Sequence, residues 1–430
     1  MRRFAAPAAL AVLAVALSWS HWTGAVQWTP DGLFYESQAR ELVGTPAQQA
    51  RHDVFFGALG RSVADPAHRL QDPRWIAFAA RFYRRRWVVP ALSDVLRPLF
   101  GVRSLLIVSL LAYVASGLLA YALARRRFGV AASAAAGAFT LWYPPLRSWA
   151  AFPLTDSSGV AALLLALLAC ERALHGPRRR VAVWTAAVLL VAFTRDTAVI
   201  AAAAGLAVAA VHRTRRAAAI GAAGVLAALP APLLFGAPLR ATLAFTFSGN
   251  QVPVVDTWHS VLHAYPTFVR WMFETDFPFA SSMRVDAVLV GLVALLAVKP
   301  SGEAPLRRVW TAAFVVTAGF VAVAAVLVSP LQLATFADPV PAGVLLIGAV
   351  LPLFLTPRSR DPFLALLRGG ALASVAYLFL LPQYTALRLA LVVLPFAALG
   401  VARAVELARA AAPQRGVNEA VSIPKYVGAS

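Results

Sequence analysis

The sequence predicts an all-α fold, a polytopic transmembrane helical bundle of about twelve spans with a large first external loop that carries amphipathic surface helices. Composition is the first reason, because 60% of the 430 residues are hydrophobic and only 13% are charged, against about 25% in a soluble domain. The second is that the apolar residues, with a mean hydropathy of +0.71, gather in long runs. The third is that arginine clusters separate these runs.

The apolar runs follow one another along most of the chain. They cover residues 4–26, 101–124, 128–149, 153–172, 181–194, 197–212, 217–235, 285–299, 309–329, 340–356, 366–382 and 387–408. Each is predicted to be helical, because lipid cannot satisfy the open backbone groups of other structures. The count stays open at the fifth and sixth runs, because both are short and Arg195-Asp196 lies between them.

Basic residues predict the orientation of the spans, since positive charge is concentrated in cytoplasmic loops. Every even-numbered gap is basic, with clusters at 125–127, 178–180, 213–216, 299–308 and 358–360 and in the C-terminal tail. This pattern predicts a cell-membrane protein with both termini in the cytoplasm. Residues 411–430 are expected to form a short, disordered cytoplasmic tail. The net charge of +20 comes from these clusters, so no nucleic-acid partner is expected.

Two gaps on the predicted external side are long, at residues 27–100 and 236–284. Large loops on one face indicate that binding or chemistry takes place there. The first of them carries about ten arginines on the side where the topology rule expects few. Either they form a solvated basic face, or some of them hold an anionic group such as a phosphate through bidentate hydrogen bonds.

The first external loop opens with a predicted surface helix. Thr29 or Asp31 can cap this helix. Its apolar residues are Leu33, Phe34, Ala39 and Leu42, and Glu36, Arg40 and Glu41 are expected to face water. Such a helix is typical of one that lies along the membrane surface. Asp31 would then lie at the bilayer boundary, either as a cap alone or as a functional carboxylate.

Five other features are candidates for binding. The basic-aromatic segment 81–90 is either an interfacial anchor or a holder of a lipid phosphate through its arginines at 84–86. Asp156 is either a helix cap or a functional acid at membrane depth. Arg195-Asp196 is predicted to be a local ion pair, and Arg388 either snorkels to the interface or faces a bound phosphate. His259 and His263 have the spacing of metal ligands, but a lone surface pair is more often incidental.

Five short patches carry a resemblance to a known family. They are Asp31 to Tyr35, Tyr83 to Leu92, Thr155-Asp156, Phe193-Thr194-Arg195, and the run Tyr384 to Pro395. With the layout of anchor helix, large external loop and later spans, they resemble the GT-C class of integral membrane glycosyltransferases. This class contains the protein mannosyltransferases and the lipid A aminoarabinose transferase.

The resemblance implies one transmembrane domain over residues 1–410 and a sugar donor carried on a polyprenyl phosphate. In that family an acidic residue of the first external loop acts as base or orients the acceptor, which is the role implied for Asp31. Arg84, Arg85 and Arg388 become phosphate contacts. Tyr35, Asp156 and Arg195 are the other implied substrate-binding residues. Some members carry paired acidic residues where this chain has Asp31-Gly32, so the need for a divalent cation stays open, as do the sugar, the acceptor and the oligomeric state.

Two alternatives remain at this stage. A secondary transporter would share the layout of about twelve spans, but predicts two repeated halves, which the sequence does not display, and short outer loops. A non-catalytic protein that binds or flips lipid-linked glycan would have much the same sequence. Membrane lipid would surround the protein under either alternative.

Overall fold

The computed structural model describes the chain in several ranges. These are residues 2–65, 68–235, 239–247, 257–274, 346, 348–354, 361–380 and 391–411. Within these ranges every regular element is an α-helix or a short 3-10 helix, which confirms the all-α class. The predicted spans 285–299 and 309–329, most of 340–356, Arg388 and the tail after 411 lie outside the described residues.

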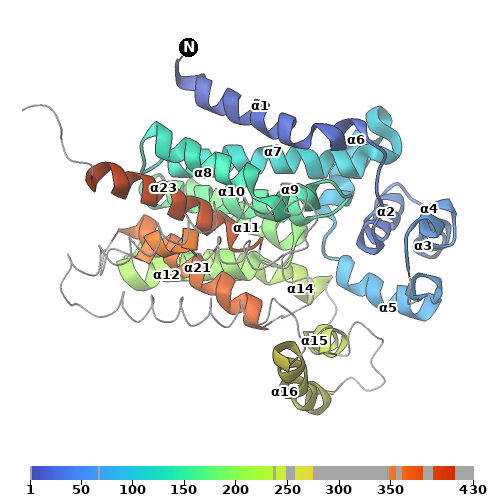
Figure 1. Ribbon diagram of the computed structural model, residues 1–430. Coiled ribbons are helices and arrows are strands. Elements are labelled where there is room, and N and C mark those ends of the chain that lie inside the picture. The colour runs from blue at the N-terminus through green and yellow to red at the C-terminus, as the bar shows by residue number, and fades with distance from the viewer. Residues whose placement is uncertain are drawn as a thin grey trace, which may run out of the picture.

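A bundle of long helices forms the larger part of the molecule (Figure 1). Its elements are α1 (Arg2–Thr23), α7 (Ser104–Ala124), α8 (Val130–Trp142), α9 (Pro144–Ala150), α10 (Asp156–His175), α11 (Arg179–Thr194), α12 (Ala198–His212), α13 (Arg215–Ala228), α14 (Pro230–Leu234), η3 (Leu351–Phe354), α21 (Pro362–Leu380) and α23 (Leu394–Ala411). The predicted span 128–149 is two elements, α8 and α9, because Pro144-Pro145 begins a new helix.

Four helical segments in the described ranges are long and apolar enough to cross a membrane. They are Phe4–Thr23, Val88–Ala124, Asp156–His175 and Arg215–Leu234. Three further apolar helices, Val130–Trp142, Ala198–His212 and Pro362–Tyr377, are shorter. The structure therefore has several helices suited to a bilayer, and the total of about twelve spans stays a prediction.

Small residues let the bundle helices approach closely, as is common between membrane helices. A methyl group at Gly205 of α12 or Gly224 of α13 would lie 3.1 Å from the ring of Trp184 of α11. The same indole donates a hydrogen bond from Nε1 to the Ile220 carbonyl over 2.9 Å. Runs 181–194 and 197–212 are thus two separate helices that share α13 as a neighbour, with a short turn at residues 195–197.

The described arginine clusters, at 125–127, 178–180 and 213–216, lie at the end of the bundle opposite the first long loop (Figure 1). At one end Arg126, after α7, pairs with Glu171 near the end of α10 over 2.7 Å. Glu406 of α23 reaches the same turn, where it accepts from the Gly129 amide over 2.8 Å. At the other end, helices α2 to α5 pack beyond α9 (Figure 1). This separation of ends is observed, while the end that faces the cytoplasm stays a prediction.

The first predicted external loop folds into a helical unit of its own. It contains α2 (Pro30–Leu42), α3 (Ala47–Phe55), α4 (Ala58–Ser62), η1 (Arg69–Gln71), α5 (Pro73–Tyr83), α6 (Val88–Phe100) and η2 (Gly101–Arg103). Leu33, Phe34, Val54, Phe55 and Ile76 form its apolar core. The second predicted external loop contains α15 (Leu239–Phe247) and α16 (Trp258–Glu274), and it meets the first where the ring of Phe245 stacks on Phe82 at 4.8 Å.

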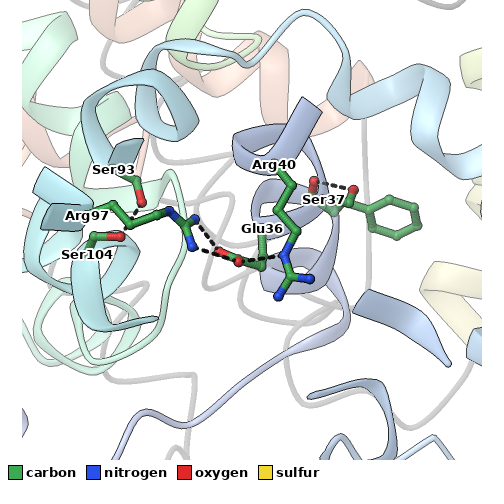
Figure 2. Close-up of polar contacts among 7 residues, drawn as sticks. Glu36, Ser37, Arg40, Ser93, Arg97 and Ser104 are labelled. Carbon is green, nitrogen blue, oxygen red and sulfur yellow. Dashed lines mark hydrogen bonds and ion pairs between the residues drawn. The ribbon is translucent and has the colours of Figure 1, made fainter. Parts of the chain in front are cut away.

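Burial corrects the prediction for α2. Glu36 was expected to face water, but it is only 1% exposed. Its Oε1 accepts from Arg40 Nε over 3.0 Å and its Oε2 from Arg97 Nη2 over 2.8 Å, so one carboxylate ties α2 to α6 (Figure 2). The amphipathic pattern assumed a helix covered on one side by lipid, whereas tertiary packing covers α2 on most sides.

Helix α6 folds back along α7 after a break at Gly101, whose φ is 56°. The hydroxyls of Ser93 and Ser104 meet at 2.7 Å (Figure 2), and Val89 packs with Leu105 and Val108. The residue before α6, Trp87, therefore reaches α11, where its ring lies 5.3 Å from that of Phe193.

Candidate functional site

Asp31 lies at the start of α2, directly after the segment that leaves α1. Thr29 is the residue that caps this helix, because its Oγ1 accepts from the Gly32 amide over 3.2 Å. Asp31 Oδ1 instead accepts a 2.7 Å hydrogen bond from the hydroxyl of Tyr83 at the end of α5. A methyl group at Gly32 would lie 3.0 Å from the side chain of Pro153, so α2 passes close to the segment before α10.

Tyr83 lies at the centre of an aromatic and cationic cluster. Its ring stacks on Phe34 at 4.4 Å and meets the edge of Tyr35 at 5.4 Å. The guanidinium of Arg86 lies 5.5 Å from the same ring. Burial, and next the charge of Asp31, raise the pKa of Tyr83 well above its usual value, so the phenol stays protonated and continues to donate to Asp31.

Tyr35 joins the first loop to the bundle. Its hydroxyl lies 3.0 Å from Thr155 Oγ1, just before α10, and accepts from Arg86 Nη1 over 3.1 Å. Tyr35 is fully buried. This phenol therefore fixes the distance between the arginine segment and the first turn of α10.

Asp196 is held by two arginines of the first loop. Its Oδ1 lies 2.5 Å from Arg85 Nε, and its Oδ2 lies 2.5 Å from Arg86 Nη2. Burial works to raise the pKa of Asp196, but the charges of Arg86 and Arg85 outweigh it and hold the pKa well below the usual range. Burial likewise works to lower the pKa of Arg86, and Asp196 more than reverses this. Asp196 and Arg86 are therefore both charged at neutral pH.

Arg195 pairs with Asp156, not with its neighbour Asp196. Arg195 Nη1 lies 2.6 Å from Asp156 Oδ1, and both side chains are less than a tenth exposed. The predicted local pair Arg195-Asp196 is wrong, because extended backbone at Arg195, with φ −159° and ψ 163°, sends adjacent side chains to different partners. Asp156 is also not the cap of α10, since Thr155 occupies that position.

The start of α10 is recessed within the bundle. Ser116 of α7 donates to the Ser157 carbonyl over 3.4 Å. Ser116 lies about 18 Å along α7 from its first residue, Ser104, at the α-helical rise of 1.5 Å per residue. The ion pair of Asp156 and Arg195 therefore lies well below the corner between α6 and α7.

These contacts form two groups that adjoin along the chain, and we call the two together the polar network. The pair of Asp156 and Arg195 is next to Thr155 and Asp196 in the sequence, and hydrogen bonds, ion pairs and a cation–π contact join the other members. Its members are Asp31, Tyr35, Tyr83, Arg85, Arg86, Thr155, Asp156, Arg195 and Asp196. Near it, the buried hydroxyls of Ser157, Ser158 and Thr197 make no hydrogen bond to the part of the chain that the structure describes. They leave donors and acceptors available beside the charged groups.

Five of the seven residues that the sequence singled out belong to the polar network: Asp31, Tyr35, Arg85, Asp156 and Arg195. Arg84 does not, because it is the exposed residue that ends α5. Arg388 lies outside the described residues. Sequence reasoning did not select Tyr83, Arg86, Thr155 or Asp196 as site residues, although the basic-aromatic segment 81–90 signalled the first two.

The structure offers no obvious metal centre among the residues it describes, because no three or more His, Cys, Asp or Glu side chains are grouped to hold an ion. The rings of His259 and His263 lie 6.4 Å apart on α16. A need for a divalent cation therefore stays open.

The chain matches no protein-family model and no curated protein. The chemistry of the site must consequently be argued from the polar network itself.

Proposed function

We propose that this protein is a membrane glycosyltransferase that moves a sugar from a polyprenyl-phosphate donor to a lipid, glycan or protein acceptor at the external face. The observation that carries the proposal is the polar network, in which the Asp31 carboxylate lies one aromatic ring away from the guanidinium of Arg86. An acid–base group and cations for a phosphate are the two requirements of this chemistry.

The transfer uses these groups as follows. An acceptor hydroxyl or amine attacks the anomeric carbon of the sugar, and Asp31 takes the proton that the acceptor loses. The bond between that carbon and the phosphate oxygen breaks, and the phosphate leaves with the electron pair. General-base catalysis of this kind contributes about 10²–10⁴-fold, and positioned cations stabilise the charge that develops on the leaving phosphate.

The position of the polar network also supports the proposal. Asp31 and Tyr83 lie in the folded first loop, and Asp156 lies at the start of α10, at the opposite end of that helix from Glu171 and its partner Arg126. The phosphate of a lipid-linked donor stays near the headgroups, while its chain remains in the bilayer. A site at which the first loop meets the membrane helices suits a donor of this kind.

The test is a transfer assay with Asp31→Asn in membranes supplied with donor lipid. We expect turnover to fall by about 10²-fold or more at normal expression, because the amide cannot accept the proton. Asp53→Asn, which changes an exposed carboxylate of the same loop, is the matched control and should retain activity. Full activity of Asp31→Asn would refute the role of Asp31, and the absence of transfer by the unaltered protein would favour the transporter or binding alternatives.

A further inference from the structure

The contact of Asp196 with Arg85 and Arg86 joins two connecting segments. Arg85 and Arg86 lie between α5 and α6, and Asp196 lies in the turn between α11 and α12. None of the three residues is inside a helix. Segments of this kind can shift without breaking helical hydrogen bonds, so the contact can open at lower cost than one between two helices.

The two arginines hold Asp196 in the manner in which arginines hold phosphate. Arg86 Nη2 donates a hydrogen bond to Asp196 Oδ2, and Arg85 Nε forms an ion pair with Asp196 Oδ1, each over 2.5 Å. Guanidinium N–H groups also suit two oxygens of a phosphate group. The side chains of Arg85, Arg86 and Asp196 are 11%, 16% and 18% exposed. The site is thus largely desolvated but remains open to a small part of the solvent.

Asp196 and an incoming anion would compete for the same two arginines. Arg195 is already matched by Asp156, and Asp196 is the carboxylate that pairs with both Arg85 and Arg86. The phosphodiester of a lipid-linked sugar carries a single negative charge, and the phosphate monoester that transfer leaves carries about 1.5 to 2 at pH 7. If either entered while Asp196 stayed in place, two anions would share the same donors in a poorly hydrated site, where like charges repel strongly.

We propose that Arg85 and Arg86 form a phosphate-binding site whose internal occupant is Asp196, and that Asp196 leaves when a phosphate group enters. This inference rests on the proposed function for the expectation that the substrate carries a phosphate. In the empty site Asp196 keeps the two cations together and compensated. In the loaded site the phosphate takes its place, and the turn at residues 195–197 moves with it.

The test measures binding by thermal unfolding of the purified protein in detergent, with and without ligand. The variant is Asp196→Asn, and the ligands are inorganic phosphate and farnesyl phosphate, with farnesol as the tail without the charge. Without ligand the variant should unfold at a lower temperature, because two buried arginines lose their counterion. With phosphate it should recover, with an apparent affinity on the order of tenfold tighter than that of the unaltered protein, since the amide no longer competes.

Comparison of inorganic phosphate with farnesyl phosphate distinguishes a site for any phosphate group from a site for a lipid headgroup. Recovery with both means that the phosphate group alone suffices, and recovery with farnesyl phosphate only means that the site takes a lipid headgroup. Farnesol should have no effect in either case. A variant that neither phosphate ligand stabilises more than the unaltered protein would overturn the proposal.

Glu171→Gln is the matched control, since it removes a buried carboxylate from Arg126 at the opposite end of the bundle. Equal rescue of both variants by phosphate would mean general screening of positive charge and would also overturn the proposal. If Asp196→Asn is too unstable to purify, the variant Arg85→Gln/Asp196→Asn keeps the charge balance. It should bind phosphate through Arg86 at least as tightly as the unaltered protein, and failure to bind would count against the site.

This experiment does not depend on turnover. A protein that transfers no sugar but shows tighter phosphate binding in Asp196→Asn keeps the binding site and loses the proposed function. A protein that transfers sugar but shows no such change keeps the function and loses the role of Asp196.

Discussion

At the scale of single residues, the hydroxyl of Tyr83 is a direct partner of the Asp31 carboxylate. The hydrogen bond between them is 2.7 Å long, and the Tyr83 ring is fixed by Phe34 and Arg86. A neutral donor beside a carboxylate favours its ionised form. Asp31 must be ionised to accept a proton, so Tyr83 supports the form that the proposed reaction needs.

Tyr83→Phe tests this role. The variant keeps the ring and removes the donor, so Asp31 becomes easier to protonate. We expect the rising limb of the pH–rate profile to move to higher pH, and the folded state to lose about 1.5–3 kcal/mol, as for other hydrogen bonds to charged groups. Transfer rates measured between pH 4 and 9 give the first result and thermal unfolding the second. An unchanged profile in a folded variant would show that the hydroxyl has no part in the reaction.

Asp196 gives a second prediction at this scale, for stability against pH. Because Arg86 and Arg85 hold its pKa below the usual value, the ionised form stabilises the folded chain. This contribution is fully present above about pH 4, the pKa of an unfolded aspartate, and is lost as the pH falls toward the folded pKa. Thermal unfolding of the unaltered protein and of Asp196→Asn should therefore differ most at neutral pH and converge below pH 4. A difference that stays constant with pH would contradict the ion pairs.

At the scale of helices, α10 and the turn after α11 fit together because α10 carries a glycine at their contact. A methyl group at Gly159 would lie 2.8 Å from Cδ and 3.3 Å from Cβ of Arg195. The first distance is too short for two carbon atoms and the second is tight, so the arginine or the helix would have to shift. The pair of Asp156 and Arg195 depends on this close approach.

Gly159→Ala should therefore destabilise the protein, although alanine is the better helix former. Overpacking of a tightly packed contact costs about 1–3 kcal/mol, which exceeds the gain in helix propensity of about 1 kcal/mol. Denaturant unfolding in detergent measures the difference. Ser158→Ala is the control, because it removes a hydroxyl without a partner in the described structure and should stay within about 0.5 kcal/mol. If Gly159→Ala were more stable than the unaltered protein, the Arg195 side chain would have moved aside at little cost.

The same scale shows how much the sequence could predict. The length and hydropathy of the apolar runs predicted where the helices α1, α7, α10, α11, α12 and α13 lie, because the bilayer imposes length and composition on each run. They did not locate the contacts of Glu36, since those depend on the return of α6, which a break at Gly101 sets. They also gave Arg195 the wrong partner, because Asp156 comes close only after α10 and α11 pack.

At the scale of the whole molecule, the polar network assembles from four stretches of chain that are far apart in sequence. Asp31 and Tyr35 come from α2, and Tyr83, Arg85 and Arg86 come from the end of α5 and the segment that follows it. The remaining members come from the start of α10 and the turn after α11. Each stretch was a separate weak candidate in the sequence. Only the fold shows that these stretches meet at one place. It also shows that Arg84, one residue from Arg85, is exposed and lies outside the network.

The final prediction concerns the side of the membrane on which this network opens. Arginine clusters mark the cytoplasmic ends of spans, and here they lie at the end opposite the polar network. The only native cysteine, Cys170, is buried, so introduced cysteines can be labelled against a low background. In intact cells an impermeant maleimide should label Ala64→Cys in the first loop, and should label Arg178→Cys in the turn after α10 only once the membrane is opened. The reverse pattern would place the Asp31 carboxylate on the cytoplasmic side, where a donor that presents its phosphate at the external surface could not reach it.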